Sequence, residues 1–172
     1  MNYETTAEIE IAVAYRFGIR QNVIVPNVSW AIFNDRECDL VILNKNGYCS
    51  EVEIKISRSD LVKDKEKWHH HNPGTYFKYL WFALPEKLEK DIIHVPNQAG
   101  ILIVLKNGVV KQIRQSQINN RARKLSYEDR YKLARLGAIR IWDLKSNVQT
   151  LKRKRLEDSR YEEAVKMGKY CV

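Results

Sequence analysis

The chain contains a strand–turn–strand segment whose turn residues determine which side chains lie opposite one another. Residues 38–43 form a nearly continuous apolar run that holds one acid, Asp39, and residues 48–56 alternate as a second strand. Between them, residues 44–47 read Asn-Lys-Asn-Gly, which is typical of a hairpin turn. A three-residue loop with Gly47 in the left-handed conformation places Asp39 opposite Glu53. A two-residue loop would place Asp39 opposite Ile54 instead, on the other face from Glu53.

In the three-residue register, two acids and a lysine share one face of the sheet. Lys55 follows Glu53 by two positions and therefore projects from the same side of the strand. Two neighbouring carboxylates repel each other unless a cation lies between them, and Mg²⁺ is bound by one or two carboxylates together with water and phosphate oxygens. Lys55 could then position water and offset charge on a phosphate. The alternative is that Asp39 ends a strand and that Glu51, Glu53 and Lys55 form a solvated strand face.

The remaining pattern predicts an α/β fold with a mixed sheet. Thr5 and Glu8 have the spacing of a capping box, and Gly18 ends the helix that follows them. We expect helices at 5–17, 57–68, 126–136 and 151–167, and strands at 28–33, 38–43, 48–56, 79–84, 100–105, 109–114 and 139–144. This order predicts one domain over residues 1–145, followed by a basic, helical tail over residues 146–172.

The charge distribution points to a polyanionic partner. The formal net charge is +9, and residues 106–172 hold 18 Lys and Arg against 7 Asp and Glu, whereas residues 1–105 hold 12 against 14. The three cysteines form no C-x-x-C pair, which argues for reduced thiols and against a zinc ribbon. Because no apolar run approaches the length of a membrane span, we expect a soluble, cytoplasmic protein that does not contact a membrane.

The Asp39 and Glu53-Ile54-Lys55 pattern resembles the PD-(D/E)XK nuclease superfamily, in which an Asp precedes a (D/E)-x-K motif. More specifically, the chain resembles the MmcB-like DNA repair proteins. The similar segments are EVEIKISRSDLVKDKEKW, YLWFALP, AGILIVLKNGVVKQIR and NNRARKLSYEDRYKLARL, so the resemblance covers about residues 20–145. The chain departs from that family by one extra residue between Asp64 and Trp68, by a His-rich insertion after Trp68, and by the tail after Leu144.

This resemblance implies a restriction-endonuclease-like core that binds Mg²⁺ or Mn²⁺ and cuts the DNA backbone. Asp39 and Glu53 would be metal ligands, and Lys55 would be the catalytic lysine. Many superfamily members add a glutamate from an N-terminal helix, for which Glu8 is the candidate. Glu10 competes for that role, and Glu8 also fits the capping box with Thr5.

Several basic residues are candidates for contact with nucleic acid. They follow the predicted catalytic strand or lie in two dense clusters: Arg58, Lys65, Lys67, Arg121, Arg123, Lys124, Lys152, Arg153, Lys154 and Arg155. Helix capping and i,i+4 ion pairs are the alternative for those near residue 60, and a solvated or protein-bound helix is the alternative for the tail. The tract His69–His71 is more typical of a loop than of a zinc site.

The predicted function is that of a metal-dependent DNA nuclease in DNA repair, with RNA not excluded as a substrate. One alternative is a non-catalytic nucleic-acid-binding protein on the same fold. Another is a structure-selective nuclease such as a junction resolvase, which would require a homodimer.

Overall fold

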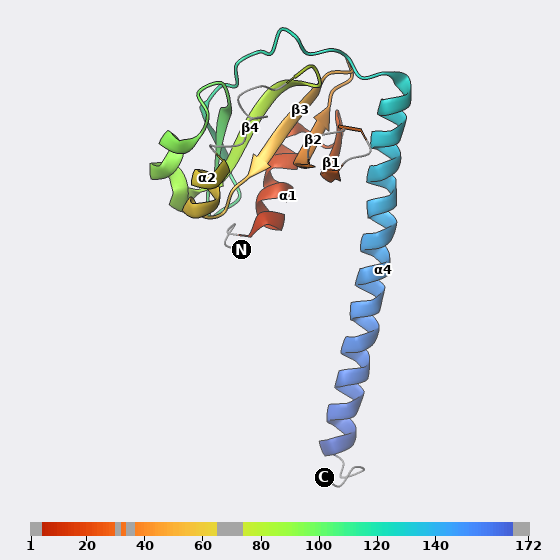
Figure 1. Cartoon of the computed structure of the whole chain (residues 1–172). Helices are drawn as coiled ribbons and strands as arrows, with labels where there is room; N and C mark the ends of the chain where they lie inside the picture. Colours follow the sequence, from red (N-terminus) through yellow and green to blue (C-terminus); the bar gives the residue numbers. More distant parts are fainter. Residues whose placement is uncertain (1–4, 30–31, 34–36, 65–73, 167–172) are drawn as a thin grey trace. The chain divides into compact units, whose positions relative to one another are not determined.

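A six-stranded mixed sheet forms the centre of the protein (Figure 1). The computed structural model describes residues 5–29, 32–33, 37–64 and 74–166, with side chains up to residue 159. The strands follow one another across the sheet in chain order: β1 Val23–Ser29, β2 Glu37–Leu43, β3 Cys49–Ile54, β4 Phe77–Pro85, β5 Gly100–Val104 and β6 Val110–Arg114. The pairs β3–β4 and β4–β5 are parallel, and the other pairs are antiparallel.

Helices cover both faces of this sheet because each face is apolar. Helix α1 (Thr6–Phe17) buries Ile9 and Val13 against a face that includes Val52 and Ile54 of β3. On the opposite face, α2 (Arg58–Asp64) and the 3-10 helix η1 (Glu86–His94) pack on even-numbered residues of β4 and odd-numbered residues of β5. The predicted fold class, a mixed sheet flanked by helices, is confirmed, and the arrangement is compatible with a restriction-endonuclease-like core.

The hairpin between β2 and β3 adopts the three-residue register. Leu43 pairs with Cys49 and Leu40 pairs with Val52, while the Asn44 amide donates to the Tyr48 carbonyl at 3.0 Å. Gly47 has a φ of 89°, a left-handed conformation that glycine adopts without steric cost. Of the two registers that the turn left open, the structure thus has the one that places Asp39 and Glu53 on the same face.

Two predicted strands are wrong. The first strand begins at Val23 rather than at residue 28 and contains Pro26, which is tolerated because β1 lies at the edge of the sheet. The predicted strand at 139–144 lies within a continuous helix, α4 (Tyr127–Lys166), which passes through Gly137. A short apolar run does not distinguish strand from helix, and a helix tolerates an internal glycine at a cost of about 1 kcal/mol.

The chain divides into two compact units, residues 1–134 and residues 135–172. The predicted boundary at residues 145 and 146 falls inside α4. In the second unit, every described side chain from residue 141 to residue 159 is exposed. No helix in the described part of the chain combines the length and the apolar character that crossing a membrane requires.

Candidate active site

A buried ion pair lies at the carboxyl end of β3. The Lys55 Nζ donates to Glu53 Oε2 at 2.8 Å, and the two residues are only 5% and 3% exposed. Lys55 directly follows the strand, and its backbone amide donates to the Ala83 carbonyl of β4 at 3.1 Å. Removing two charges from water is costly, so the pair persists because each charge neutralises the other at hydrogen-bonding distance.

Asp39 joins this pair through the backbone between its two members. Its Oδ2 accepts from the Ile54 amide at 2.7 Å, one residue from both Glu53 and Lys55. The β2–β3 ladder ends at Leu40 and Val52, so Asp39 is the next residue of β2 beyond the paired segment. The structure thus brings together the three residues to which the sequence assigned catalytic roles.

Glu51 lies on the same face and is more deeply buried than a solvated strand face would allow. It is 1% exposed, and its Oε1 accepts from the Cys38 thiol at 3.3 Å. The alternative that Glu51, Glu53 and Lys55 form a solvated face is therefore wrong. Sequence reasoning missed Cys38 as a partner because a lone cysteine in an apolar run carries no signal of its own.

The donor atoms of this site suit a hard divalent cation. Asp39 and Glu53 supply carboxylate oxygens, and the contacts just described engage Oδ2 of the one and Oε2 of the other. Among the described residues, no group of three or more His, Cys, Asp or Glu side chains is arranged to hold a metal. A cation here would therefore be held by two carboxylates and completed by water and phosphate oxygens, as Mg²⁺ commonly is.

Glu8, the third predicted metal ligand, belongs to the capping box of α1. Its Oε2 accepts from the Thr5 amide at 3.0 Å and from the Thr5 hydroxyl at 2.7 Å. Helix α1 covers the face that carries Val52 and Ile54, whereas Glu53 alternates to the opposite face. The described contacts do not bring Glu8 to the ion pair, and its metal-binding role stays a prediction.

The predicted DNA-binding residues fall into separate places. Arg58 begins α2, and its Nε donates to Asp91 of η1 at 2.9 Å, so a carboxylate already offsets part of its charge. Lys65, Lys67 and His69–His71 lie outside the described residues. Residues 152–155 occupy one exposed turn of α4 in the second unit.

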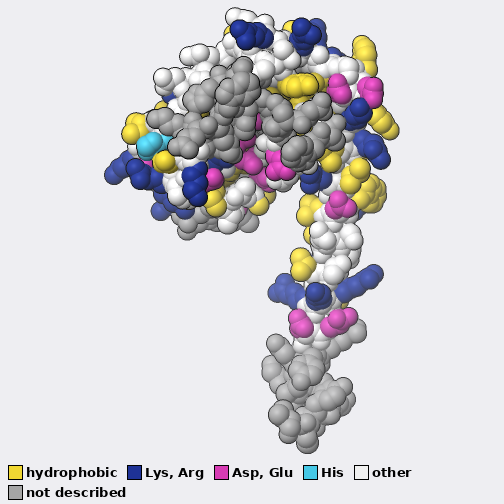
Figure 2. All heavy atoms as spheres, viewed as in Figure 1, with side chains coloured by type: hydrophobic (Ala, Val, Ile, Leu, Met, Phe, Trp, Pro, Cys, Tyr) yellow, Lys and Arg dark blue, Asp and Glu magenta, His cyan; other side chains and the backbone are white. Residues whose placement is uncertain are grey.

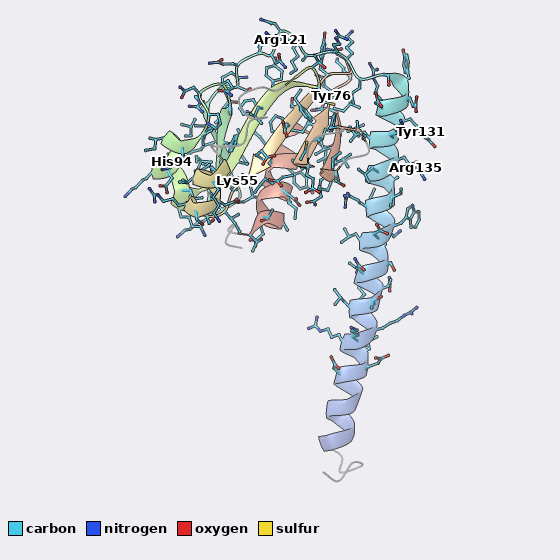
Figure 3. All side chains as sticks on the ribbon, viewed as in Figure 1. Lys55, Tyr76, His94, Arg121, Tyr131 and Arg135 are labelled. Carbon is cyan, nitrogen blue, oxygen red and sulfur yellow. The ribbon has the colours of Figure 1, made fainter. Side chains whose placement is uncertain are left out.

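Three other basic residues lie at the far end of the sheet from Lys55. Arg121, Arg123 and Lys124 are exposed, and the Arg123 amide donates to the Thr75 carbonyl just before β4. Cys49 and Lys55 are six residues apart along β3, so about 20 Å of strand separates the two ends. Figure 3 shows Lys55 and Arg121 at these opposite ends, and Figure 2 shows Lys and Arg side chains gathered over the segment between β6 and α4.

Lys78 adds to this basic end, and sequence reasoning missed it because an isolated lysine in a β-strand carries no signal. Its Nζ lies 4.0 Å from the centre of the Tyr48 ring, and the Lys124 Nζ lies 5.7 Å from the same ring. We call Lys78, Arg121, Arg123 and Lys124 the basic rim.

Comparison with known proteins agrees with the fold and with the general role. A solved structure described as "SPO1766 protein of unknown function from Silicibacter pomeroyi" is 19% identical, with a TM-score of 0.56, over 90% of this chain and 94% of that one. At this identity the likeness supports the fold alone. No curated protein matches the chain. A family model described as "DNA repair protein MmcB-like" matches residues 2–148. The chain therefore belongs to the MmcB-like family of DNA repair proteins.

Proposed function

We propose that this protein is a metal-dependent nuclease that hydrolyses phosphodiester bonds in DNA. The observation that carries the proposal is the buried Glu53–Lys55 pair with the Asp39 carboxylate bonded to the peptide between its members. An apolar pair of similar volume would often stabilise a sheet as well or better, so stability alone is a weak reason for burying these charges. Buried, paired charges of this kind are common at functional sites.

Each residue has a distinct role in the proposed reaction. Asp39 and Glu53 would hold Mg²⁺ or Mn²⁺, which supplies an acidified water and neutralises charge on the phosphate. The Ile54 amide orients the Asp39 carboxylate. The Lys55 ammonium lies against Glu53, so its proposed role is to hold the attacking water or a phosphate oxygen beside that carboxylate. In hydrolysis the attacking water loses one proton to solvent as its oxygen bonds to phosphorus, and the leaving oxygen opposite it takes up one proton as its bond to phosphorus breaks.

The choice of DNA as substrate is supported by the family description and by the charge of the chain. The match is to a family of DNA repair proteins, and the net charge is +9. Contacts between the basic rim and backbone phosphates would release counterions, so binding should weaken steeply as salt rises.

A second candidate is a DNA-binding protein on the same fold that does not cut. One observation favours it: Glu53 and Lys55 form a buried ion pair with each other. In that case the pair is structural, and the carboxylates need not bind a metal. Titration with Mn²⁺ by calorimetry separates the two candidates, since only the nuclease requires a cation site that depends on Asp39.

Cleavage of supercoiled and of single-stranded circular DNA, with Mg²⁺, with Mn²⁺ and with EDTA, tests the proposal. We expect metal-dependent cleavage that falls by about 100-fold or more in Lys55→Met and Asp39→Asn, since removing one electrostatic group from such a site costs that much. Lys63→Met, at an exposed position of α2, is the matched control and should cleave normally. Cleavage that persists in both site variants, once circular dichroism shows that they are folded, would contradict the proposal.

A further inference from the structure

A pocket of about 430 Å³ lies beside the first residues of β4, a size typical of small-ligand sites. Strand β5 begins at Gly100, which pairs with Trp81, so its pairing with β4 does not extend to the residues of β4 before Trp81. The segment that follows β6 packs beside those residues instead. There, the Asn119 amide donates to the Lys78 carbonyl at 3.0 Å. The residues that line the pocket are Phe77, Lys78, Leu80, Gln98, Gln117, Ile118, Asn119, Asn120 and Arg121.

The pocket combines amide side chains with apolar ones. Gln98, Gln117 and Asn120 each carry both a donor and an acceptor, which is the combination that the edge of a nucleobase requires. Ile118, which is 56% exposed, contributes the apolar surface that a base plane needs, and Leu80 lies behind it in the lining. The pocket therefore has the chemistry to hold a planar, hydrogen-bonding ring.

Asn119 fixes the shape of this wall. Its Nδ2 donates to the Gly74 and Phe77 carbonyls at 3.0 and 2.9 Å, and its Oδ1 accepts from the Arg121 amide at 3.0 Å. These bonds anchor the segment of residues 117–121 to the start of β4, so the neighbouring amides are presented from a fixed backbone.

Cations complete the site. Lys78 and Arg121 belong both to the pocket lining and to the basic rim, so they can bind a phosphate attached to the sugar of a bound base. Figure 3 shows Arg121 at this end of the sheet. In a duplex the base edges are paired and stacked, so a concave pocket of this kind can admit a base only after it has left the helix.

The pocket lies on the same face of the sheet as the candidate active site. Leu80, which lines the pocket, pairs with Glu51 of β3, and Phe82 pairs with Glu53. Leu80 is therefore two residues along β4 from the position opposite Glu53. Glu51 and Lys55 are four residues apart, or about 13 Å of strand. At 3.4 Å per stacked nucleotide, this distance corresponds to about four nucleotides.

We propose that this pocket binds an unpaired nucleotide of a DNA strand, with the amides of residues 98, 117 and 120 on the base edge and the two cations on the phosphate. The protein would then select DNA that contains a single-stranded stretch within a few nucleotides of the bond it cuts. The inference rests on the proposed DNA substrate, but it does not require cleavage.

Fluorescence anisotropy of the full chain with a labelled single strand and with a matched duplex, both in EDTA, tests the pocket. The side chains of Gln117 and Asn120 are exposed, so the double variant Gln117→Ala/Asn120→Ala should fold normally. We expect its affinity for the single strand to fall by about fivefold or more, the range for lost base-edge contacts. Its affinity for the duplex and its dependence on salt should stay unchanged.

Two further variants separate base recognition from charge. Arg121→Gln should weaken both DNAs and reduce the slope of log affinity against log salt by about one. Gln112→Ala, an exposed amide of β6 outside the pocket, is the matched control and should bind normally. Unchanged single-strand affinity in the double variant, or an equal loss for the duplex, would overturn the pocket proposal. Because EDTA prevents cleavage, this result is independent of whether the protein is a nuclease.

Discussion

Removal of Lys55 from the buried pair should destabilise the fold severely. Two unit charges at 2.8 Å attract by about 6 kcal/mol at an effective dielectric of 20. Their side chains are 6% and 4% exposed, so the charge of Glu53 cannot regain water when Lys55 becomes Met. Because the variant no longer has to remove the Lys55 charge from water, part of the lost attraction is offset. We therefore expect Lys55→Met to cost about 3–5 kcal/mol, the range for breaking buried pairs.

Urea denaturation of a double-mutant cycle measures this coupling. The variants are Lys55→Met, Glu53→Gln and their combination. The combined variant should be more stable than the sum of the single losses predicts, because neither member of the pair is left behind without the other. The Glu128–Lys132 pair is a matched control, since it has the same 2.8 Å separation but side chains that are 76% and 45% exposed. Lys132→Met should leave the midpoint within experimental scatter, because exposed pairs contribute little.

Two results would refute this reasoning. One is a loss of under about 1 kcal/mol in Lys55→Met, which is the value for exposed pairs. The other is a combined variant whose loss equals the sum of the single losses, because the two charges would then be independent. For a chain of this length, the expected loss corresponds to a fall in Tm of about 6–20 °C, which calorimetry can check separately.

Three other predictions concern the scaffold. Gly100→Ala should cost about 1–3 kcal/mol in thermal unfolding, because a Cβ there would collide with the ring of Trp81. Thr5→Ala removes the N-cap of α1 and should cost about 1 kcal/mol by urea denaturation. Burial raises the pKa of the Cys49 thiol from 9.0 to about 12, although Arg130 partly opposes the shift. The neutral thiol of Cys49 thus stabilises the fold below pH 9, and this contribution is lost as the pH rises toward 12. Denaturation measured as a function of pH can follow this loss. The native thiol should also resist iodoacetamide at pH 8.

Local chemistry made the hairpin and the first helix predictable. The turn at residues 44–47 predicted a hairpin but left two registers open, because a left-handed Gly47 fits both a two-residue and a three-residue loop, and the structure has the three-residue one. Thr5 and Glu8 likewise satisfied the first amides of α1 from within three residues of each other. In both cases all the interacting groups are close in sequence.

Features that depend on distant contacts were not predictable. The edge position that allows Pro26 in β1 is a property of the whole sheet, and the apolar run at residues 139–144 fits a helix as well as a strand. The sequence placed Glu53 and Lys55 on one face but could not show that they are buried, because burial depends on how α2, η1 and β4 pack. The pocket beside β4 was equally invisible, since its lining comes from three separate segments.

A crystal structure of the full chain soaked in Mn²⁺, with anomalous scattering measured at the manganese edge, tests the central claim most directly. We predict one anomalous peak within about 2.2 Å of a carboxylate oxygen from both Asp39 and Glu53, and its loss in Asp39→Asn crystals. An unchanged Glu53–Lys55 pair with no anomalous peak beside Asp39, at Mn²⁺ concentrations that support DNA cleavage, would contradict the account.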